Sequence, residues 1–171
     1  MENNIHIRIM EKTDAPFLHK LYNNPEIMSY WFEEAHLSIQ ALEKSFDDNV
    51  ESEKNRQFIV MNGEEKVGIV ELVSIDWRHR NAEFTIIIAP EHQGKGYARP
   101  ATQLAIDYGF YTLNLHKLYL FVDKINDKAI RVYEKAGFQV EGVAREMFFV
   151  NGTYHDAAVM GMYQRDVLGN A

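Results

Sequence analysis

The sequence contains no cysteine, and this absence excludes several kinds of chemistry. Without thiols the chain forms no disulfide bond, uses no cysteine nucleophile and builds no zinc site of the cysteine type. The seven histidines are scattered and show no ligand spacing, so we expect no metal site.

Long apolar runs are missing as well. No stretch approaches the ~20 residues that a transmembrane helix needs, so we expect no membrane partner. Residues 1–4 lack the basic and apolar parts of a signal peptide, which predicts a cytoplasmic location. The length of 171 residues suits one compact core, and we expect residues 1–171 to form a single domain.

Positive charge is scarce in one part of the chain. Residues 26–53 hold eight acidic side chains against Lys44 alone, so this segment carries the whole formal net charge of −7. The negative balance argues against nucleic-acid binding. A cationic ligand would suit the segment, although a solvated acidic face would give the same pattern.

Apolar periodicity predicts a mixed α/β fold. Two Asn-Gly pairs, at 62–63 and 151–152, predict hairpin turns, and Gly137 predicts a helix end. Pro25 ends the first helix. Strands are predicted at 5–9, 57–61, 66–73, 81–88, 117–122, 145–150 and 154–163, and helices from the caps Thr13, Ser38 and Asn126 to about Tyr22, Val50 and Ala136, with one more at about 97–112.

A glycine-rich loop, Gln93-Gly94-Lys95-Gly96-Tyr97-Ala98, joins a predicted strand to a predicted helix. Its glycines allow close backbone approach, and the N–H groups at a helix start attract anions. The loop therefore indicates a phosphate site, unless it is only a tight turn. It is not a Walker loop, because no Ser or Thr follows Gly-Lys, and it lacks the glycine spacing of dinucleotide-binding folds.

In this loop Gln93, Gly96 and Ala98 fill the three fixed places of the acyl-CoA signature of the GNAT acetyltransferases. The order of elements resembles that family over almost the whole chain. The resemblance implies an α/β (α+β) GNAT fold: a mixed, mostly antiparallel sheet of six to seven strands flanked by helices. It also implies acetyl-CoA as cosubstrate, bound where the fourth and fifth strands splay apart.

A second segment, residues 123–138, resembles the family's other cofactor motif. The resemblance implies three groups of cofactor-binding residues: the strand residues Ile86, Ile87 and Ile88; the loop residues Gln93, Gly94, Lys95, Gly96, Tyr97, Ala98 and Arg99; and the helix residues Asn126, Lys128, Ala129, Tyr133 and Lys135.

Two residues are candidates for the proton transfers. The family uses a tyrosine at the place of Tyr133 as general acid; from the residues alone, a core tyrosine on an amphipathic helix is the alternative. An alkylammonium has a pKa of about 10.4 and must lose a proton before it attacks a thioester. Glu83 is the best candidate, as a base acting through water or as an anchor for a cationic substrate.

The pentad Tyr30-Trp31-Phe32-Glu33-Glu34, followed by an acidic helix, resembles the bacterial spermidine N-acetyltransferases. In that family the region is a regulatory polyamine site between subunits of a dodecamer, which implies a homo-oligomer. Relatives carry an acid at the place of Ser74 that helps Glu33 hold a divalent ion, so the serine disfavours a metal site here. The implied substrate or allosteric residues are Glu33, Glu34, Glu43, Glu83, Phe84 and Thr85.

These features predict an enzyme that transfers acetyl from acetyl-CoA to a primary amine of spermidine or spermine by direct attack in a ternary complex. A protein N-terminal acetyltransferase of the ribosomal-protein type, or another small-amine acetyltransferase of the same fold, is the alternative within the class. A polyamine- or CoA-binding sensor without turnover is the alternative outside it.

Overall fold

A seven-stranded sheet organises the chain in the computed structural model, which describes residues 4–49 and 52–169. The strand order is β1-β2-β3-β4-β5-β7-β6. Neighbouring strands pair antiparallel except β4 and β5, which pair parallel. The strands are β1 (Ile5–Ile9), β2 (Arg56–Asn62), β3 (Glu65–Asp76), β4 (Asn81–Ile88), β5 (Lys117–Asp123), β6 (Gln139–Val150) and β7 (Thr153–Tyr163). The predicted mixed, mostly antiparallel sheet is confirmed.

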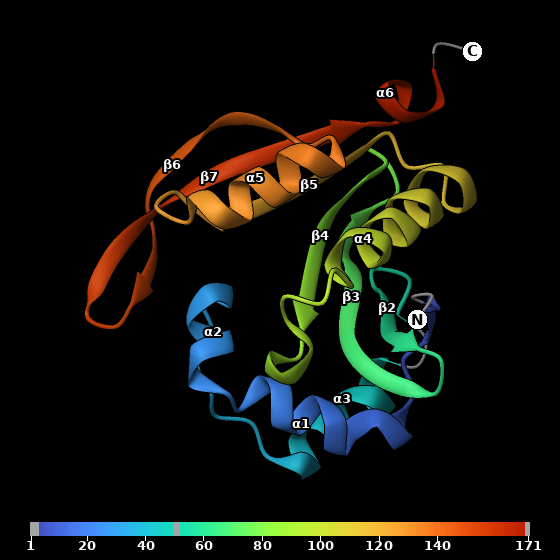
Figure 1. The fold of residues 1–171 in the computed structure, drawn as a ribbon, viewed down its shortest axis with the longest axis vertical. Coiled ribbons are helices and arrows are strands. Elements are labelled where there is room, and N and C mark those ends of the chain that lie inside the picture. Colours follow the sequence, from blue (N-terminus) through green and yellow to red (C-terminus); the bar gives the residue numbers. More distant parts are fainter. Residues whose placement is uncertain (1–3, 50–51, 170–171) are drawn as a thin grey trace.

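Helices cover both faces of this sheet (Figure 1). They are α1 (Ala15–Tyr22), α2 (Pro25–Trp31), α3 (Ile39–Asn49), α4 (Ala98–Asp107), α5 (Asp127–Ala136) and α6 (Gln164–Leu168), with the 3-10 turns η1 (Lys12–Asp14) and η2 (Pro90–His92) and the π-helical segment η3 (Tyr108–Thr112). No helix in the described ranges is long and apolar enough to span a bilayer.

The strands supply two cores because successive side chains point to opposite faces. On one face Leu72, Phe84 and Leu118 pack with α4 and α5. On the other face Ile69 and Ile87 pack with α1, α2 and α3. These residues are at most 4% exposed, so the sheet is buried on both sides near its centre.

The two halves of the sheet separate between β4 and β5. These strands pair only at Asn81–Lys117, Ala82–Leu118 and Glu83–Tyr119. Beyond Glu83, β4 stays with β3 and β5 stays with β7. Consequently β5, β6, β7 and α5 turn away from the first four strands (Figure 1), and the predicted splay is confirmed.

Local capping predictions hold at two helices. The Ser38 hydroxyl accepts a hydrogen bond from the Ala41 N–H at 3.1 Å and so caps α3. Asn126 caps α5 by accepting from the Ala129 N–H at 3.0 Å, and Gly137 ends α5 with a φ of 106°. Val50 and Glu51, which the sequence places at the end of the acidic helix, lie outside the described residues.

Other boundary predictions were wrong. Thr13 lies in η1 instead of capping a helix, and α1 begins at Ala15. Pro25 ends one helix as expected but also begins α2, because Asn24 caps it by accepting from the N–H groups of Glu26 and Ile27. The predicted helix 97–112 changes to π-helical geometry at η3, β6 starts at Gln139 instead of residue 145, and α6 was not predicted.

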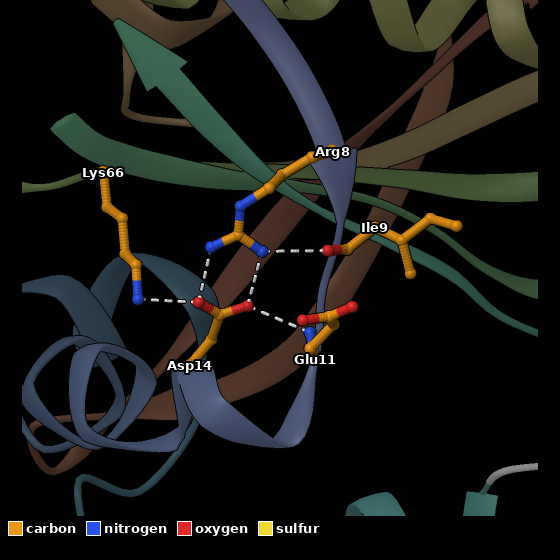
Figure 2. Close-up of polar contacts among 5 residues, drawn as sticks. All are labelled: Arg8, Ile9, Glu11, Asp14 and Lys66. Atoms are coloured by element: carbon orange, nitrogen blue, oxygen red, sulfur yellow. Dashed lines mark hydrogen bonds and ion pairs between the residues drawn. The ribbon is translucent and has the colours of Figure 1, made fainter. Parts of the chain in front are cut away.

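A buried ion cluster fastens the first helical segment to the sheet (Figure 2). Asp14 has no exposed surface, and its Oδ1 lies 2.6 Å from Arg8 Nη2 and 2.7 Å from Lys66 Nζ. Its Oδ2 accepts from Arg8 Nη1 at 2.8 Å and from the Glu11 N–H at 2.9 Å. Burial opposes ionisation, but the bonds from Arg8 and Lys66 outweigh it and lower the pKa of Asp14 well below its usual range.

We expect Asp14→Asn to destabilise the fold by about 3–5 kcal/mol, because it leaves two cations without their buried partner. Asp47→Asn is the control: Asp47 pairs with Lys12 at 2.7 Å on the surface, and such pairs contribute about 0–1 kcal/mol. Urea unfolding at pH 7 measures both variants. Equal stability of the two variants would contradict the assignment.

The same cluster makes the unfolding free energy depend on pH in the acidic range. Because the folded pKa of Asp14 is lowered, its contribution is complete above the unfolded value of about 3.9 and is lost as the pH falls below it. The difference in unfolding free energy between the wild type and Asp14→Asn should therefore shrink as the pH falls below about 4.

Candidate active site

A cavity of about 560 Å³ fills the gap between β4 and β5. Side chains from both faces of the sheet line it. Phe84, Ile86 and Leu120 come from the α5 side, whereas Glu83, Thr85 and Phe121 come from the α2 side. The cavity therefore passes through the sheet where β4 and β5 separate, and each face contributes its own set of side chains.

Tyr133 of α5 lines the cavity together with Asn126 and Ala129. Its ring packs edge-on against Phe84 and Phe138, at centroid distances of 6.3 and 6.1 Å. Burial raises the pKa of Tyr133 to about 12, so the phenol keeps its proton at neutral pH. Within residues 4–49 and 52–169 its hydroxyl has no hydrogen-bonding partner, which leaves the proton available to a ligand.

The edge of β4 that faces β5 offers backbone groups to an extended ligand. Beyond Glu83, β4 pairs with β3 only, so the edge that faces β5 has no strand partner. An amide-bearing chain can add to such an edge as a further strand. Ile86 lines the cavity, whereas the Ile87 side chain packs into the core beneath α1–α3.

The glycine loop follows the end of β4. Gly94 and Gly96 have φ values of 76° and 82°, and an added Cβ would meet no atom within 4 Å at either position. Only glycine adopts these angles readily, and the space beside the backbone is open. The amide of Gln93 donates to the Ile88 carbonyl at 3.1 Å, which ties the loop to the strand.

The other loop residues differ in exposure. Lys95 and Arg99 are exposed, and Ala98 begins α4, whose free N–H groups favour an anion. The Tyr97 side chain is instead buried, and its hydroxyl accepts from Asn62 at 3.1 Å. Tyr97 thus anchors the loop in the core, and only its backbone remains for a ligand.

The predicted cofactor lysines of α5 lie apart from the cavity. Lys128 and Lys135 surround a shallow pocket on the helix surface together with Arg131. Their positive charge suits a distal phosphate, and their role stays a prediction.

Aromatic rings and carboxylates form the α2 side of the cavity. Phe32 and Phe148 stack at a centroid distance of 3.7 Å with an interplanar angle of 2°, and Phe121 lies edge-on to Phe148. Burial raises the pKa of the Glu83 carboxyl, which makes it a stronger base than an exposed glutamate. Cations bind well to such a combination of rings and acids.

Not all of the predicted acceptor residues meet here. Glu33, Glu83 and Thr85 line the cavity on its α2 side. Phe84 points to the opposite side, against Tyr133. Glu34 lines a neighbouring pocket of about 290 Å³ beside the turn between β6 and β7, and Glu33 borders both spaces.

Glu43 is exposed on α3 and lines neither space. Within the described chain it is thus separate from Glu33 and Glu34.

Sequence reasoning missed Glu71 and the wall formed by Phe121 and Phe148. Glu71 had a usable signal, because it is the one acid in the apolar run from Val67 to Val73. Phe148 had none, since only the tertiary fold brings β6 against the end of α2.

A family model for the acetyltransferase (GNAT) domain matches residues 4–139. The chain belongs to the GNAT family. Spermidine N(1)-acetyltransferase of Escherichia coli K12 is 47% identical over 166 residues, which cover 97% of this chain and 89% of that protein. The predicted family and the GNAT fold are thereby confirmed.

Solved GNAT structures agree with this fold. Spermidine N-acetyltransferase from Vibrio cholerae, in complex with CoA and spermine, superposes with a TM-score of 0.94 at 46% identity and covers 96% of this chain and 98% of its own. A dodecameric structure of the Vibrio cholerae enzyme gives 0.88 at 45% identity, with 96% of each chain covered.

We expect Gly96→Ala to raise the KM for acetyl-CoA severalfold, because the methyl group strains the loop and occupies the space where a diphosphate would approach. Gly63→Ala is a matched control: Gly63 has a φ of 61°, equally open surroundings and a place in the β2–β3 turn. Both variants should lose about 1 kcal/mol of stability. Initial rates at varied acetyl-CoA concentration give the KM of each variant. Equal KM values for Gly96→Ala and Gly63→Ala would show that the loop does not belong to the donor site.

Proposed function

We propose that this GNAT protein transfers acetyl from acetyl-CoA to a primary amine of spermidine or spermine, by direct attack in a ternary complex. The observation that carries the proposal is the cavity through the sheet, with Tyr133 toward one face and the carboxylates Glu33 and Glu83 toward the other. The similarity to the spermidine acetyltransferases of Escherichia coli and Vibrio cholerae supports it.

The cavity's chemistry favours a polycation as the acceptor. Polyamines are flexible and carry several ammonium groups, so separated carboxylates bind them with little demand on shape. Glu33 and Glu83 come from different elements, and the stacked Phe32 and Phe148 cover the same side. Aliphatic stems can pack on these rings while the ammonium groups reach the acids.

The donor would lie along β4 and the glycine loop. Backbone groups beside Ile86 and Ile88 suit the pantetheine amides, and the N–H groups of residues 93–99 suit the diphosphate. This orientation directs the thioester toward Tyr133, which extends into the same cavity from α5.

In the reaction the neutral amine nitrogen attacks the thioester carbonyl carbon. A C–N bond forms and the C–S bond breaks. The amine proton passes to Glu83, directly or through water; where Glu83 only anchors the amine, the proton passes to water. Tyr133 protonates the departing sulfur. The strand N–H near Ile86 polarises the carbonyl oxygen, and alignment of both reactants in one cavity supplies much of the rate.

The high pKa of Tyr133 has a consequence for this transfer. A phenol at about 12 gives its proton reluctantly to a thiolate whose free thiol has a pKa of about 8.5. Burial that raises the phenol pKa also raises that of a thiol in the same cavity. The value for Tyr133 already includes burial, so the gap between the two pKa values narrows when the thiol is buried beside it.

The proposal extends to the location, the domain organisation and the assembly of the protein. We place the reaction in the cytoplasm and treat residues 1–171 as one catalytic domain. A homo-oligomer is supported by the dodecamer reported for the Vibrio cholerae relative and by the exposed Met147, Phe149 and Tyr154 on the β6–β7 hairpin. In such an assembly Glu34 would serve the regulatory polyamine site, and Glu33, which borders both spaces, would contribute to it as well as to the acceptor site.

A thiol-release assay with a panel of acceptors tests the function. We expect CoA to appear rapidly with spermidine and spermine and slowly with peptides that offer a free N-terminal amine. Equal rates on peptides and polyamines would favour the protein acetyltransferase alternative. Polyamine binding without release of CoA would favour a sensor.

Tyr133→Phe should lower kcat about 100-fold while the KM for acetyl-CoA changes little, because the substitution removes only the transferable proton. Tyr108→Phe is the control: Tyr108 packs edge-on against Phe58 outside the cavity, so its hydroxyl should not matter. Steady-state rates with saturating spermidine measure both. An unchanged kcat in Tyr133→Phe would exclude it as the acid.

A further inference from the structure

Glu71 is a buried carboxyl in the cavity wall to which the mechanism above assigns no role. It lies on β3 between Gln57 of β2 and Thr85 of β4, its cross-strand partners in the sheet. Its residue surface is 4% exposed, and it lines the cavity on the same side as Glu83. Alternation along the strands places Glu71, Thr85 and Glu83 on the face covered by α1 and α2.

The partners of Glu71 are all neutral. Its Oε1 accepts from the Gln57 amide at 2.6 Å, and its Oε2 accepts from the Thr85 hydroxyl at 3.0 Å. The Tyr22 hydroxyl of α1 donates a further hydrogen bond. Within the described chain no lysine, arginine or histidine forms an ion pair with Glu71, in contrast to Asp14, which has two cations.

A buried carboxylate with only neutral partners is energetically costly. Burial raises the pKa of Glu71, and the three hydrogen bonds only partly offset that effect. The nearest ionisable neighbours do not help, since Glu83 on β4 is acidic and Tyr22 on α1 is neutral. An ammonium group in the cavity would supply the missing counter-charge.

The pairing of β3 with β4 sets the distance between Glu71 and Glu83. Val73 pairs with Glu83 and Glu71 pairs with Thr85, so Glu71 and Glu83 are diagonal neighbours on one face of adjacent strands. Diagonal neighbours lie roughly 7–8 Å apart in an antiparallel pair. Two carboxylates at this separation can bind two nitrogens that are joined by a short alkyl spacer.

We propose that Glu71 binds a second ammonium group of the acceptor, next to the amine held at Glu83, and so selects acceptors with two or more closely spaced amines. The inference rests on the proposed polyamine acetylation and names what determines its specificity. Glu71 is then a specificity-determining residue that leaves the reacting atoms to Glu83 and Tyr133.

Glu71→Gln tests the proposal, because glutamine keeps the size and an acceptor oxygen but removes the charge. We expect the KM for spermidine to rise about tenfold or more, with the KM values for acetyl-CoA and butylamine unchanged. Butylamine carries one amine and reaches Glu83 only. Equal losses with spermidine and butylamine would indicate a structural role, and unchanged kinetics would remove Glu71 from the acceptor site; either result overturns the proposal.

Tyr22→Phe is the matched control. It removes one hydrogen bond to Glu71 and leaves the charge in place, so the spermidine KM should stay within about twofold of the wild type. A tenfold rise in this variant would mean that the hydrogen-bond network, and not the charge, carries the effect.

Two further measurements test Glu71 if the variant does not fold or if the wild type acetylates no polyamine. If Glu71→Gln does not fold, the wild type must still prefer 1,4-diaminobutane over butylamine in kcat/KM, and equal values would overturn the proposal. If the wild type acetylates no polyamine, the proposed function fails on its own. Calorimetry with spermine then tests Glu71 separately, since equal affinity of wild type and variant would overturn its role.

Discussion

The divergence of β4 and β5 is the constraint on which the rest of the site depends. Three residue pairs join the two strands. Beyond Glu83, β4 pairs only with β3, and β5 pairs only with β7. Unpaired backbone groups inside a protein cost free energy unless a ligand or water satisfies them. The open edge therefore favours an amide-bearing chain, and the same separation creates the cavity through which two reactants can meet.

The divergence also determines where the neighbouring loop and helices lie. Because β4 leads into the glycine loop and β5 leads into α5, the divergence separates the loop from the helix that carries Tyr133. The opposite face receives α2, and Phe32, the residue that caps the end of this helix, has a positive φ of 59° and stacks on Phe148. A left-handed phenylalanine is strained, and the stacking across the cavity helps to hold it.

Buried carboxylates have different partners in the Asp14 cluster and in the candidate active site. Asp14 is buried with two cations, and its cluster holds η1 and α1 to the sheet. Glu71 and Glu83 are buried or half-buried beside the cavity, and burial raises the pKa of each. The first arrangement stabilises the fold by itself. We propose that a cationic ligand completes the second arrangement, so that the site would distinguish polyamines from neutral or singly charged amines.

Sequence reasoning succeeded where the cause is local. The glycine loop, the caps Ser38 and Asn126 and the glycine end of α5 each depend on a few neighbouring residues. It failed where one local signal has two readings or where the cause is tertiary. Pro25 reads as a helix stop but also begins α2, and β6 extends back to Gln139 because β7 pairs with it.

The apolar run from Val67 to Val73 marks Glu71 as a buried acid, but its partners could not be predicted, because they come from β2, β4 and α1. Phe148 carried no signal, because only the tertiary fold brings it against the end of α2.

A crystal structure with CoA and spermine bound together tests the central claim most directly. We predict the pantetheine arm along the open edge of β4, the diphosphate on residues 93–99 and spermine on the α2 side, with one amine beside Glu83 and the thiol between that amine and Tyr133. Both ligands on the same face of the sheet, or spermine outside the cavity between β4 and β5, would contradict the account.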